Sequence, residues 1–197
     1  MWAFHKDVKR SEINFLIDAA AKCFASHGWA LPPQPRWDVT DFGLGDYKKY
    51  GLVLINLAEQ PEYCEKLMYV RGGMVTPAHT HRKKKEDIIA RWGELSVQVW
   101  SGRPQKTKVD EFSVLINGAP RTVKSGEIVK IPAGQRITLV PGTYHEFYTS
   151  DEEAIIGEVS TANDDTNDNI FVNPEVGRYS KIEEDAPIGV RLLNEKL

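Results

Sequence analysis

The chain has 197 residues, of which 41% are hydrophobic and 27% charged, and its net charge is −3. This apolar content is typical of a soluble globular protein and excludes a chain that stays disordered. A pI near 6.0 lacks the cationic surplus of a phosphate-binding face, so we expect no nucleic-acid partner. The two cysteines, Cys23 and Cys64, are too few for a disulfide scaffold or a four-thiolate metal site.

The first residues of the chain do not have the pattern of a targeting segment. Residues 1–7 contain no long apolar region followed by a small-residue cleavage site. No run of about 18 apolar residues, the length that spans a bilayer, occurs in the sequence. We therefore expect a cytoplasmic protein with no membrane partner.

An amphipathic helix is predicted over residues 11–27. Ser11 is a suitable N-cap and Gly28 a suitable C-terminal stop. Apolar residues recur along the segment at steps of three and four, namely Ile13, Leu16, Ala20, Cys23 and Phe24. The proline-rich stretch 31–35 ends the helical register and predicts an extended connector.

Short apolar runs separated by glycine and proline turns fill the middle of the chain. The runs fall at residues 51–57, 69–71, 94–100, 112–116, 127–131, 136–140 and 154–160. Asn117 and Gly118, next to one of these runs, are a strong signal for a two-residue hairpin turn. Many short strands with such turns predict an all-β barrel or sandwich and disfavour a βαβ fold.

We expect a single domain, residues 1–197, with three parts. Residues 1–50 hold the N-terminal helix and its extended connector, and residues 51–160 form the β core. Residues 161–197 are polar and acidic, and we expect them to wrap the core as loops and short segments.

Three histidines and a glutamate have the spacing of a metal site. In a strand, His79 and His81 project from one face roughly 7 Å apart, because side chains alternate and each residue rises about 3.3 Å. Glu86 follows after a turn-sized gap, and His145 comes after a tight turn on a distant strand. Three imidazoles and one carboxylate suit a divalent transition metal and leave positions for water or substrate.

The same residues resemble the two motifs of the cupin superfamily. The first motif is matched at Gly73, His79, His81, Glu86 and Gly93. The second is matched at Gly126, Pro141, Gly142 and His145, with a longer spacer before the proline than the usual pattern. The resemblance implies a cupin-type β-barrel, also described as a double-stranded β-helix or jelly roll, with an N-terminal helical extension.

Further segments resemble the D-lyxose ketol-isomerase family of cupins. They are residues 9–14, 31–33 with Trp37, 86–88, 157–160, 163–165 and 168–169. Together they span nearly the whole chain. The resemblance implies a sugar isomerase that interconverts D-lyxose and D-xylulose, often also D-mannose and D-fructose, with Mn²⁺. Resemblance to other cupins also implies a homodimer.

Lys84 and Glu158 are the candidate catalytic residues. Isomerisation moves a proton between C2 and C1 and needs a base, while a divalent ion polarises the carbonyl and stabilises the enediolate. Lys84 shares the strand parity of Glu86 and matches the family's lysine two positions before the metal glutamate. Glu158 lies in an apolar run, where a carboxylate is rare unless it is paired or functional. A surface lysine and a core ion pair are the alternative interpretations.

Asp168 and Arg178 are the candidate substrate-binding residues. The acidic stretch 164–168 lacks the central glycine and the distal glutamate of a calcium-binding EF-hand loop. A rim that hydrogen-bonds sugar hydroxyls fits a polyol substrate better, with Asp168 as its first candidate and Arg178 nearby in sequence. A solvated loop is the alternative for both residues.

Two other functions compete with the isomerase. A cupin dioxygenase would use the same four ligands to hold Fe²⁺ and act on a small organic substrate, and ligand type alone does not distinguish Mn from Fe. A metal-free, storage-type sugar-binding cupin is disfavoured because all four candidate ligands are present.

Overall fold

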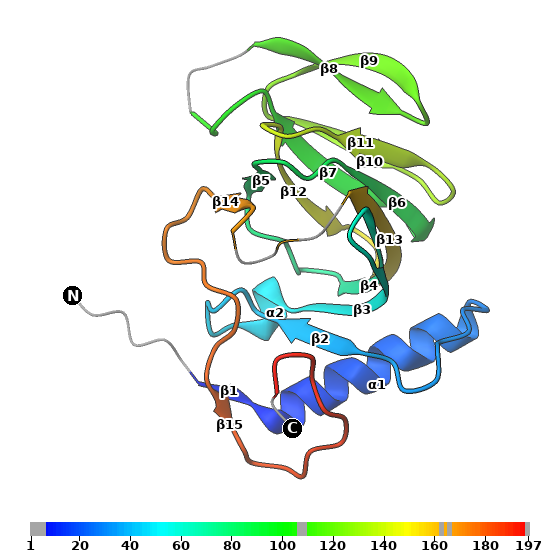
Figure 1. The fold of residues 1–197 in the computed structure, drawn as a ribbon, viewed down its shortest axis with the longest axis vertical. Helices are drawn as coiled ribbons and strands as arrows, with labels where there is room; N and C mark the ends of the chain where they lie inside the picture. The colour runs from blue at the N-terminus through cyan, green and yellow to red at the C-terminus, as the bar shows by residue number, and fades with distance from the viewer. Residues whose placement is uncertain (1–6, 106–109, 162–163, 165–166, 196–197) are drawn as a thin grey trace.

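The computed structural model describes residues 7–105, 110–161, 164 and 167–195 (Figure 1). Within these ranges the helices are α1 (Arg10–Ser26) and α2 (Tyr47–Tyr50). The strands are β1 (Val8–Lys9), β2 (Trp37–Thr40), β3 (Leu52–Glu59), β4 (Tyr63–Arg71), β5 (His79–His81), β6 (Glu86–Trp92), β7 (Leu95–Trp100), β8 (Glu111–Ile116), β9 (Ala119–Lys124), β10 (Glu127–Ile131), β11 (Arg136–Leu139), β12 (Tyr144–Thr149), β13 (Glu153–Thr161), β14 (Asn169–Phe171) and β15 (Ile182–Glu183).

Most of the strands belong to two antiparallel sheets. Among the described residues, an eight-stranded sheet has the order β2-β3-β4-β13-β6-β11-β8-β9, and a five-stranded sheet has the order β10-β7-β12-β5-β14. Both sheets contribute to one apolar core, for example Met68 and Ile88 from the first and Val97 and Phe147 from the second. The predicted all-β, cupin-type fold is therefore confirmed, in the form of a jelly-roll sandwich of two sheets rather than a closed barrel.

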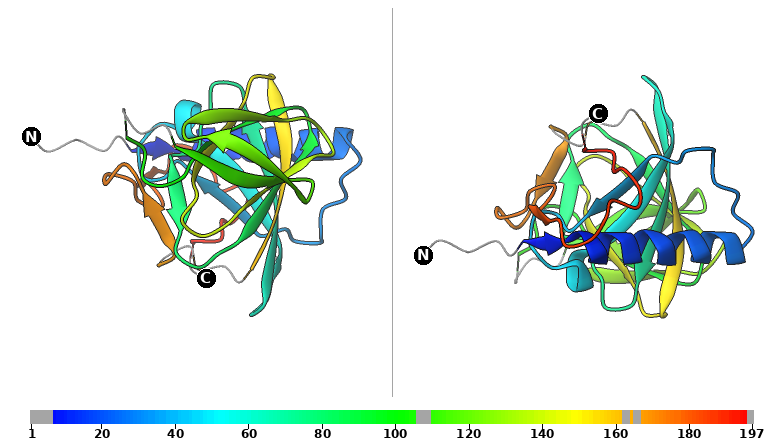
Figure 2. Two further views of the ribbon diagram at one scale, coloured as in Figure 1. Left: turned by 90° about the horizontal axis from the view of Figure 1, so that it is seen from above. Right: turned by 90° about the horizontal axis from the view of Figure 1, so that it is seen from below.

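Helix α1 covers the outer face of the eight-stranded sheet (Figure 2). Phe24 of the helix lies in an apolar cluster with Val53 and Ile55 of β3. The alternate residues of the same strand, Leu52 and Leu54, point to the opposite side and join the inner core. Because β3 is covered on both faces, its sequence is a continuous apolar run without the polar alternation of a solvated sheet.

The observed helix begins and ends one residue before the predicted one. Gly28 follows it with a φ of +76°, which confirms the predicted stop at a residue that tolerates the left-handed region. The prediction of Ser11 as N-cap is wrong, because Lys9 occupies that position. The Ser11 backbone N–H and hydroxyl instead donate to Asp185, at 2.9 and 2.7 Å. The serine therefore ties α1 to the end of the chain.

The predicted turn at Asn117 and Gly118 joins β8 to β9. Both residues have positive φ, 52° and 84°, as a type I′ hairpin turn requires, so the hairpin prediction is confirmed. The edge strand β2 was not predicted, since it lies in the region taken as an extended connector. It pairs with β3 and places Asp38 beside the core.

The C-terminal segment, residues 172–195, runs along the side of the sandwich that carries α1 and β2 (Figure 1). Leu192 bridges Trp37 in parallel, and β15 pairs with β1. The fully buried Arg10 donates to Glu184 from Nε at 2.9 Å and from Nη2 at 2.8 Å, and it also pairs with Glu195. The start and the end of the described chain are thus joined by a charged, hydrogen-bonded cluster.

Neither helix in the described part of the chain combines the length and the apolar character needed to span a lipid bilayer.

Candidate metal centre and active site

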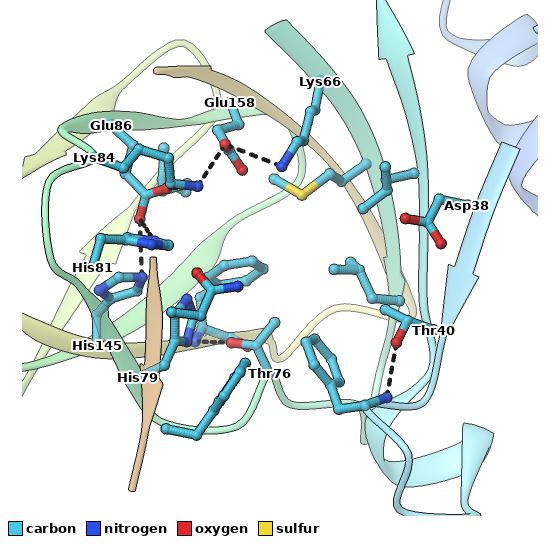
Figure 3. Close-up of a pocket in the computed structure, with 18 of the residues that line it drawn as sticks. Asp38, Thr40, Lys66, Thr76, His79, His81, Lys84, Glu86, His145 and Glu158 are labelled. Atoms are coloured by element: carbon cyan, nitrogen blue, oxygen red, sulfur yellow. Dashed lines mark hydrogen bonds and ion pairs between the residues drawn. The ribbon is translucent and has the colours of Figure 1, made fainter. Parts of the chain in front are cut away.

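A cavity with about 730 Å³ of empty space, part of it open to solvent, lies between the two sheets. One end carries histidines and buried charges, and the other end carries Asp38 and Thr40 (Figure 3). Arg178, which is hydrogen-bonded to Asp38, also lines the cavity. Apolar side chains also line the cavity, namely Leu52, Leu54, Met68, Ile88 and Phe147.

The three predicted histidine ligands meet at one end of the cavity. His79 and His81 lie on β5, and His145 lies on β12, directly opposite His79 in the strand register. One ring nitrogen from each histidine lies within 4.8 Å of the other two. Strand alternation and antiparallel pairing therefore bring together residues that are far apart in the sequence, as the spacing predicted.

The backbone orients two of these rings. His79 Nδ1 lies 2.8 Å from the carbonyl oxygen of Pro77, and His145 Nδ1 lies 3.2 Å from that of Thr143. A carbonyl oxygen can only accept, so each Nδ1 donates and each Nε2 presents its lone pair. Burial, reinforced by the neighbouring imidazoles, holds the pKa of His79 well below its usual value. His79 is therefore neutral, as a metal ligand must be.

Several buried polar atoms at this end lack a hydrogen-bond partner among the described residues. They are His81 Nδ1, His81 Nε2, His145 Nε2 and Glu86 Oε1. Glu86 Oε1 lies 3.0 Å from His145 Nε2 and 3.3 Å from His81 Nε2, so three ligand atoms converge. Unsatisfied buried groups are costly, and a divalent cation would satisfy all three atoms together. The donor set thus fits the expected metal.

A network of buried charges adjoins the histidines. Lys84 Nζ lies 2.8 Å from Glu86 Oε2 and 3.0 Å from Glu158 Oε1. Lys66 Nζ lies 3.5 Å from Glu158 Oε1, and it comes from the β4 position opposite Glu158 on β13. The four side chains are each at most 7% exposed. Two cations and two carboxylates therefore share one water-poor space.

The network fixes the charge of its members. Although burial lowers the pKa of Lys84, the carboxylates of Glu158 and Glu86 raise it above its usual value. Burial raises the pKa of Glu158, but Lys66 and Lys84 outweigh it and bring the value below normal. Burial also opposes ionisation of Glu86, and Lys84 and His81 hold its pKa well below normal. An ammonium group thus lies between two carboxylates.

Lys66 lines the cavity and was not predicted from the sequence. The signal that singled out Glu158, a charge inside an apolar run, also applies to Lys66, which precedes Leu67, Met68 and Tyr69.

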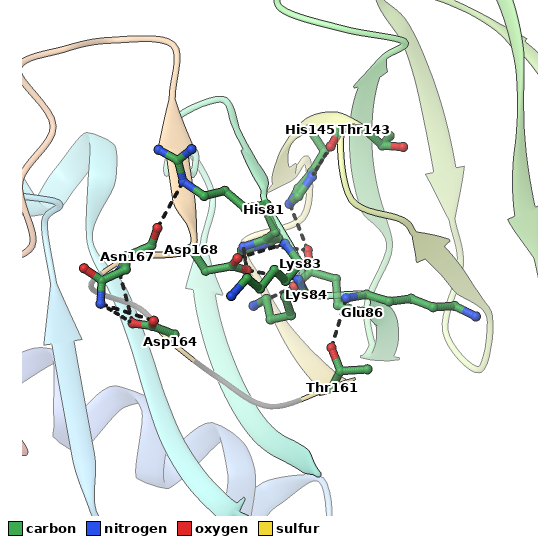
Figure 4. Close-up of polar contacts among 12 residues, drawn as sticks. His81, Lys83, Lys84, Glu86, Thr143, His145, Thr161, Asp164, Asn167 and Asp168 are labelled. Carbon is green, nitrogen blue, oxygen red and sulfur yellow. Dashed lines mark hydrogen bonds and ion pairs between the residues drawn. The ribbon is translucent and has the colours of Figure 1, made fainter. Parts of the chain in front are cut away.

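Asp168 is not among the residues that line this cavity. Figure 4 shows it beside His81, Lys83 and Lys84. Its carboxylate accepts the backbone N–H groups of Lys83 and Lys84 at 2.8 and 3.0 Å, and Oδ2 lies 3.6 Å from His81 Nδ1. These contacts hold the turn between β5 and β6. Direct binding of a sugar by Asp168 stays a prediction.

Arg178 lines the end of the cavity away from the histidines. Its Nη2 donates to Asp38 Oδ2 at 3.0 Å, and its backbone carbonyl accepts the hydroxyl of Thr40. Sequence reasoning missed Asp38, because the prolines at residues 31–35 predict an extended connector in this region. The available signal was a single acid between the apolar residues Trp37 and Val39.

The fold and the site define a cupin-type jelly roll with a candidate metal centre and buried acid–base groups. The fold is shared with the L-ribose isomerase of Cellulomonas parahominis, at a TM-score of 0.72 and 18% sequence identity over 91% of this chain and 100% of that one. At this identity the likeness shows the fold alone.

Sequence similarity is more specific. The D-lyxose isomerase family model matches residues 34–196. The chain is 33% identical to a D-lyxose/D-mannose isomerase of Escherichia coli O157:H7, over 95% of this chain and 98% of that protein. It is 37% identical to the protein of the same name from Serratia proteamaculans, over 96% and 98%. The chain belongs to the D-lyxose isomerase family, a family of aldose–ketose sugar isomerases, and these matches give the dioxygenase alternative no support.

Proposed function

We propose that the protein is a metal-dependent isomerase that interconverts D-lyxose with D-xylulose and D-mannose with D-fructose. The observation that carries this proposal is a single cavity in which three histidines and Glu86 adjoin the buried pair of Lys84 and Glu158. The names of the Escherichia coli and Serratia proteamaculans relatives, D-lyxose/D-mannose isomerase, support D-lyxose and D-mannose as the two aldoses.

His79, His81, Glu86 and His145 would hold the metal, which we infer to be Mn²⁺. The ion would polarise the sugar carbonyl and stabilise the negative charge that develops on the sugar oxygens. Asp168 supports this end of the site, because its contacts with His81 and with the backbone at Lys83 and Lys84 keep the ligands in place.

The protein groups supply the proton transfer. Glu158, ionised and close to Lys84, takes the proton from C2 of the open-chain aldose and returns it to C1 on the same face of the sugar. The C2–H electron pair forms the C1–C2 double bond of the enediolate, and the carbonyl moves from C1 to C2. Lys84 Nζ donates a proton to O1 and accepts the hydroxyl proton of O2, so atoms and charge balance.

The far end of the cavity binds the rest of the sugar. The Arg178 guanidinium lines this end and can donate to sugar hydroxyls. The apolar side chains of the cavity pack against the C–H groups of the sugar and exclude water from the transfer.

Removal and replacement of the metal tests this function. After treatment with a chelator, the protein should lose ketose formation from D-lyxose and D-mannose, and Mn²⁺ should restore it under nitrogen. In D₂O, proton transfer through Glu158 predicts deuterium at C1 of the ketose. Turnover that needs oxygen, with substrate-dependent O₂ uptake when Fe²⁺ is supplied, would contradict the proposal and favour a dioxygenase.

We also infer a homodimer, on the resemblance to other cupins. Light scattering coupled to size exclusion tests the dimer.

A further inference from the structure

The end of the cavity opposite the histidines contains a buried acid. Asp38 is 3% exposed and lines the cavity from β2, where Figure 3 shows it across the open space from His79, His81 and His145. Its strand neighbours Trp37 and Val39 point the other way, into the apolar cluster under α1. Strand alternation therefore turns the Asp38 side chain toward the cavity, at an inward-facing position where an apolar core residue would be expected.

Two groups of the C-terminal segment hold this carboxylate. Arg178 Nη2 donates to Oδ2 at 3.0 Å, and the Tyr179 hydroxyl donates to Oδ1 at 2.8 Å. The Arg178 side chain also remains 37% exposed and lines the cavity. The far end thus presents a carboxylate and a guanidinium side by side, fixed against each other.

This pairing suits a hydroxyl group. A hydroxyl donates one hydrogen bond and accepts two, whereas a carboxylate only accepts and a guanidinium only donates. A hydroxyl placed between Asp38 and Arg178 can therefore donate to the first and accept from the second. An anionic group such as a phosphate would face the negative charge of Asp38.

The polar and apolar groups of the cavity match the hydroxyl and C–H groups of an open-chain sugar. Besides its polar groups, the cavity is lined by apolar side chains, including Leu54, Met68 and Phe147, that match the C–H surface of the carbon chain. With the reacting carbons at the histidine end, the last hydroxyl of the sugar reaches toward the Asp38 end.

We propose that Asp38, together with Arg178, binds the terminal hydroxyl of the open-chain sugar and is a specificity-determining residue of the enzyme. This inference rests on the proposed function. The competing role is structural, since the same hydrogen bonds attach the C-terminal segment to β2.

Substrates with and without that hydroxyl separate the two roles. The experiment compares D-lyxose with 5-deoxy-D-lyxose in the Mn²⁺-loaded wild type, in Asp38→Asn and in the matched control Asp46→Asn. Asp46 caps α2 through the backbone N–H groups of Lys48 and Lys49 and does not line the cavity.

The wild type should prefer D-lyxose by about ten-fold or more in kcat/KM, as loss of a hydrogen bond to a charged group predicts. Asp38→Asn should reduce this preference to about two-fold or less, through a higher KM for D-lyxose with kcat nearly unchanged. Asp46→Asn should keep the wild-type preference.

Each other outcome is informative. If Asp38→Asn slows both sugars equally and keeps the preference, Asp38 is only a structural anchor. If the wild type converts both sugars equally well, no group of the protein recognises the terminal hydroxyl, and the inference is wrong. That result would leave the proposed isomerase function intact. If the loaded wild type converts neither sugar, the proposed function fails as well.

A second variant covers the case in which Asp38→Asn does not fold. Tyr179→Phe removes a hydroxyl that donates to Asp38 and accepts from Arg178 Nε, but it keeps the carboxylate and the guanidinium themselves. We expect it to lower the preference for D-lyxose about three-fold. A preference equal to that of the wild type in a folded Tyr179→Phe protein would also overturn the proposal.

Discussion

The two ends of the cavity are built in different ways. At the histidine end, His79, His145 and Glu158 lie within strands, and backbone ladders of both sheets fix their positions. At the far end, Asp38 comes from an edge strand, and Arg178 comes from the C-terminal segment, which is attached largely by side-chain hydrogen bonds. The geometry of the histidine end therefore depends on strand register within the sheets. The geometry of the far end depends on how the C-terminal segment docks against β2.

This difference separates two tasks of an enzyme. Proton transfer needs groups held close to their productive geometry, and strands inside sheets provide such positions. Selection among related sugars is a smaller energetic task, and a docked segment can change without disturbing the sheets. Substitutions at the histidine end should therefore lower kcat, and substitutions at the far end should raise KM.

The largest effect is expected from loss of a ligand. His145→Ala removes a candidate metal ligand at the convergence with Glu86 Oε1. We expect kcat/KM for D-lyxose to fall by about 10⁴-fold, since loss of metal catalysis removes several kcal/mol of stabilisation. Metal content after dialysis should fall in parallel. The control His27→Ala, which alters a ring packed on Trp92, should keep both, and full activity of His145→Ala would refute this ligand.

A smaller but still large effect is expected from loss of the base. Glu158→Gln should reduce kcat by about 10²- to 10³-fold, the usual contribution of a general base, with KM changed little. Glu153→Gln on the same strand removes a carboxylate that accepts the Tyr69 hydroxyl, and it should retain activity. Equal kcat losses in the two variants would show that the strand, rather than the base, is affected.

A substitution of Lys66 should change the pKa of the candidate base, Glu158, without removing its carboxylate. Because Lys66 lowers the pKa of Glu158, Lys66→Met should raise that pKa and move the acidic limb of the kcat profile to higher pH. The profile moves to higher pH because, at any given pH, a larger fraction of Glu158 would be protonated and therefore inactive as a base. We expect kcat to fall most on the acidic side of the profile and least at higher pH. Lys48→Met, an exposed control, should leave the profile unchanged.

The smallest effect on turnover is expected where the C-terminal segment meets α1. Arg10→Met leaves Glu184 and Glu195 without their buried cation, so the melting temperature should fall by about 5 °C or more. A looser segment should raise KM about three-fold and leave metal content unchanged. The exposed control Lys9→Met should behave as wild type. A fall in metal content in Arg10→Met would show that the two ends are not independent.

The convergence of side chains at the histidine end could be predicted from the sequence, because it follows strand periodicity. The alternation of His79 and His81 and the shared parity of Lys84 and Glu86 need only local geometry. The prediction of His145 depended on the motif that follows the turn. The prediction of Glu158 depended on the rule that a charged residue in an apolar run is rarely buried unless it is paired or functional. The structure brings all of these residues to one cavity.

The far end could not be predicted in the same way. Asp38 and Arg178 are far apart in sequence, and their contact depends on how the C-terminal segment docks, which no periodicity encodes. Asp168 was expected near sugar hydroxyls, yet its oxygens accept backbone N–H groups of the turn before Glu86. The Ser11 prediction failed for a similar reason, because a distant carboxylate, Asp185, competes for the hydroxyl.

Strands β5 and β12 are aligned through a single residue pair, His79 with His145. The geometry of the site therefore depends on the correct alignment of these two strands. A slip of one residue between β5 and β12 would turn one of these histidines to the opposite face of the sheet. The candidate ligands would then no longer converge, although most of the backbone pairing elsewhere in the five-stranded sheet would survive. Chains with this misalignment would keep most of the sheet but could not assemble the candidate metal centre. A loss of metal affinity in an otherwise folded protein would therefore reveal the misalignment.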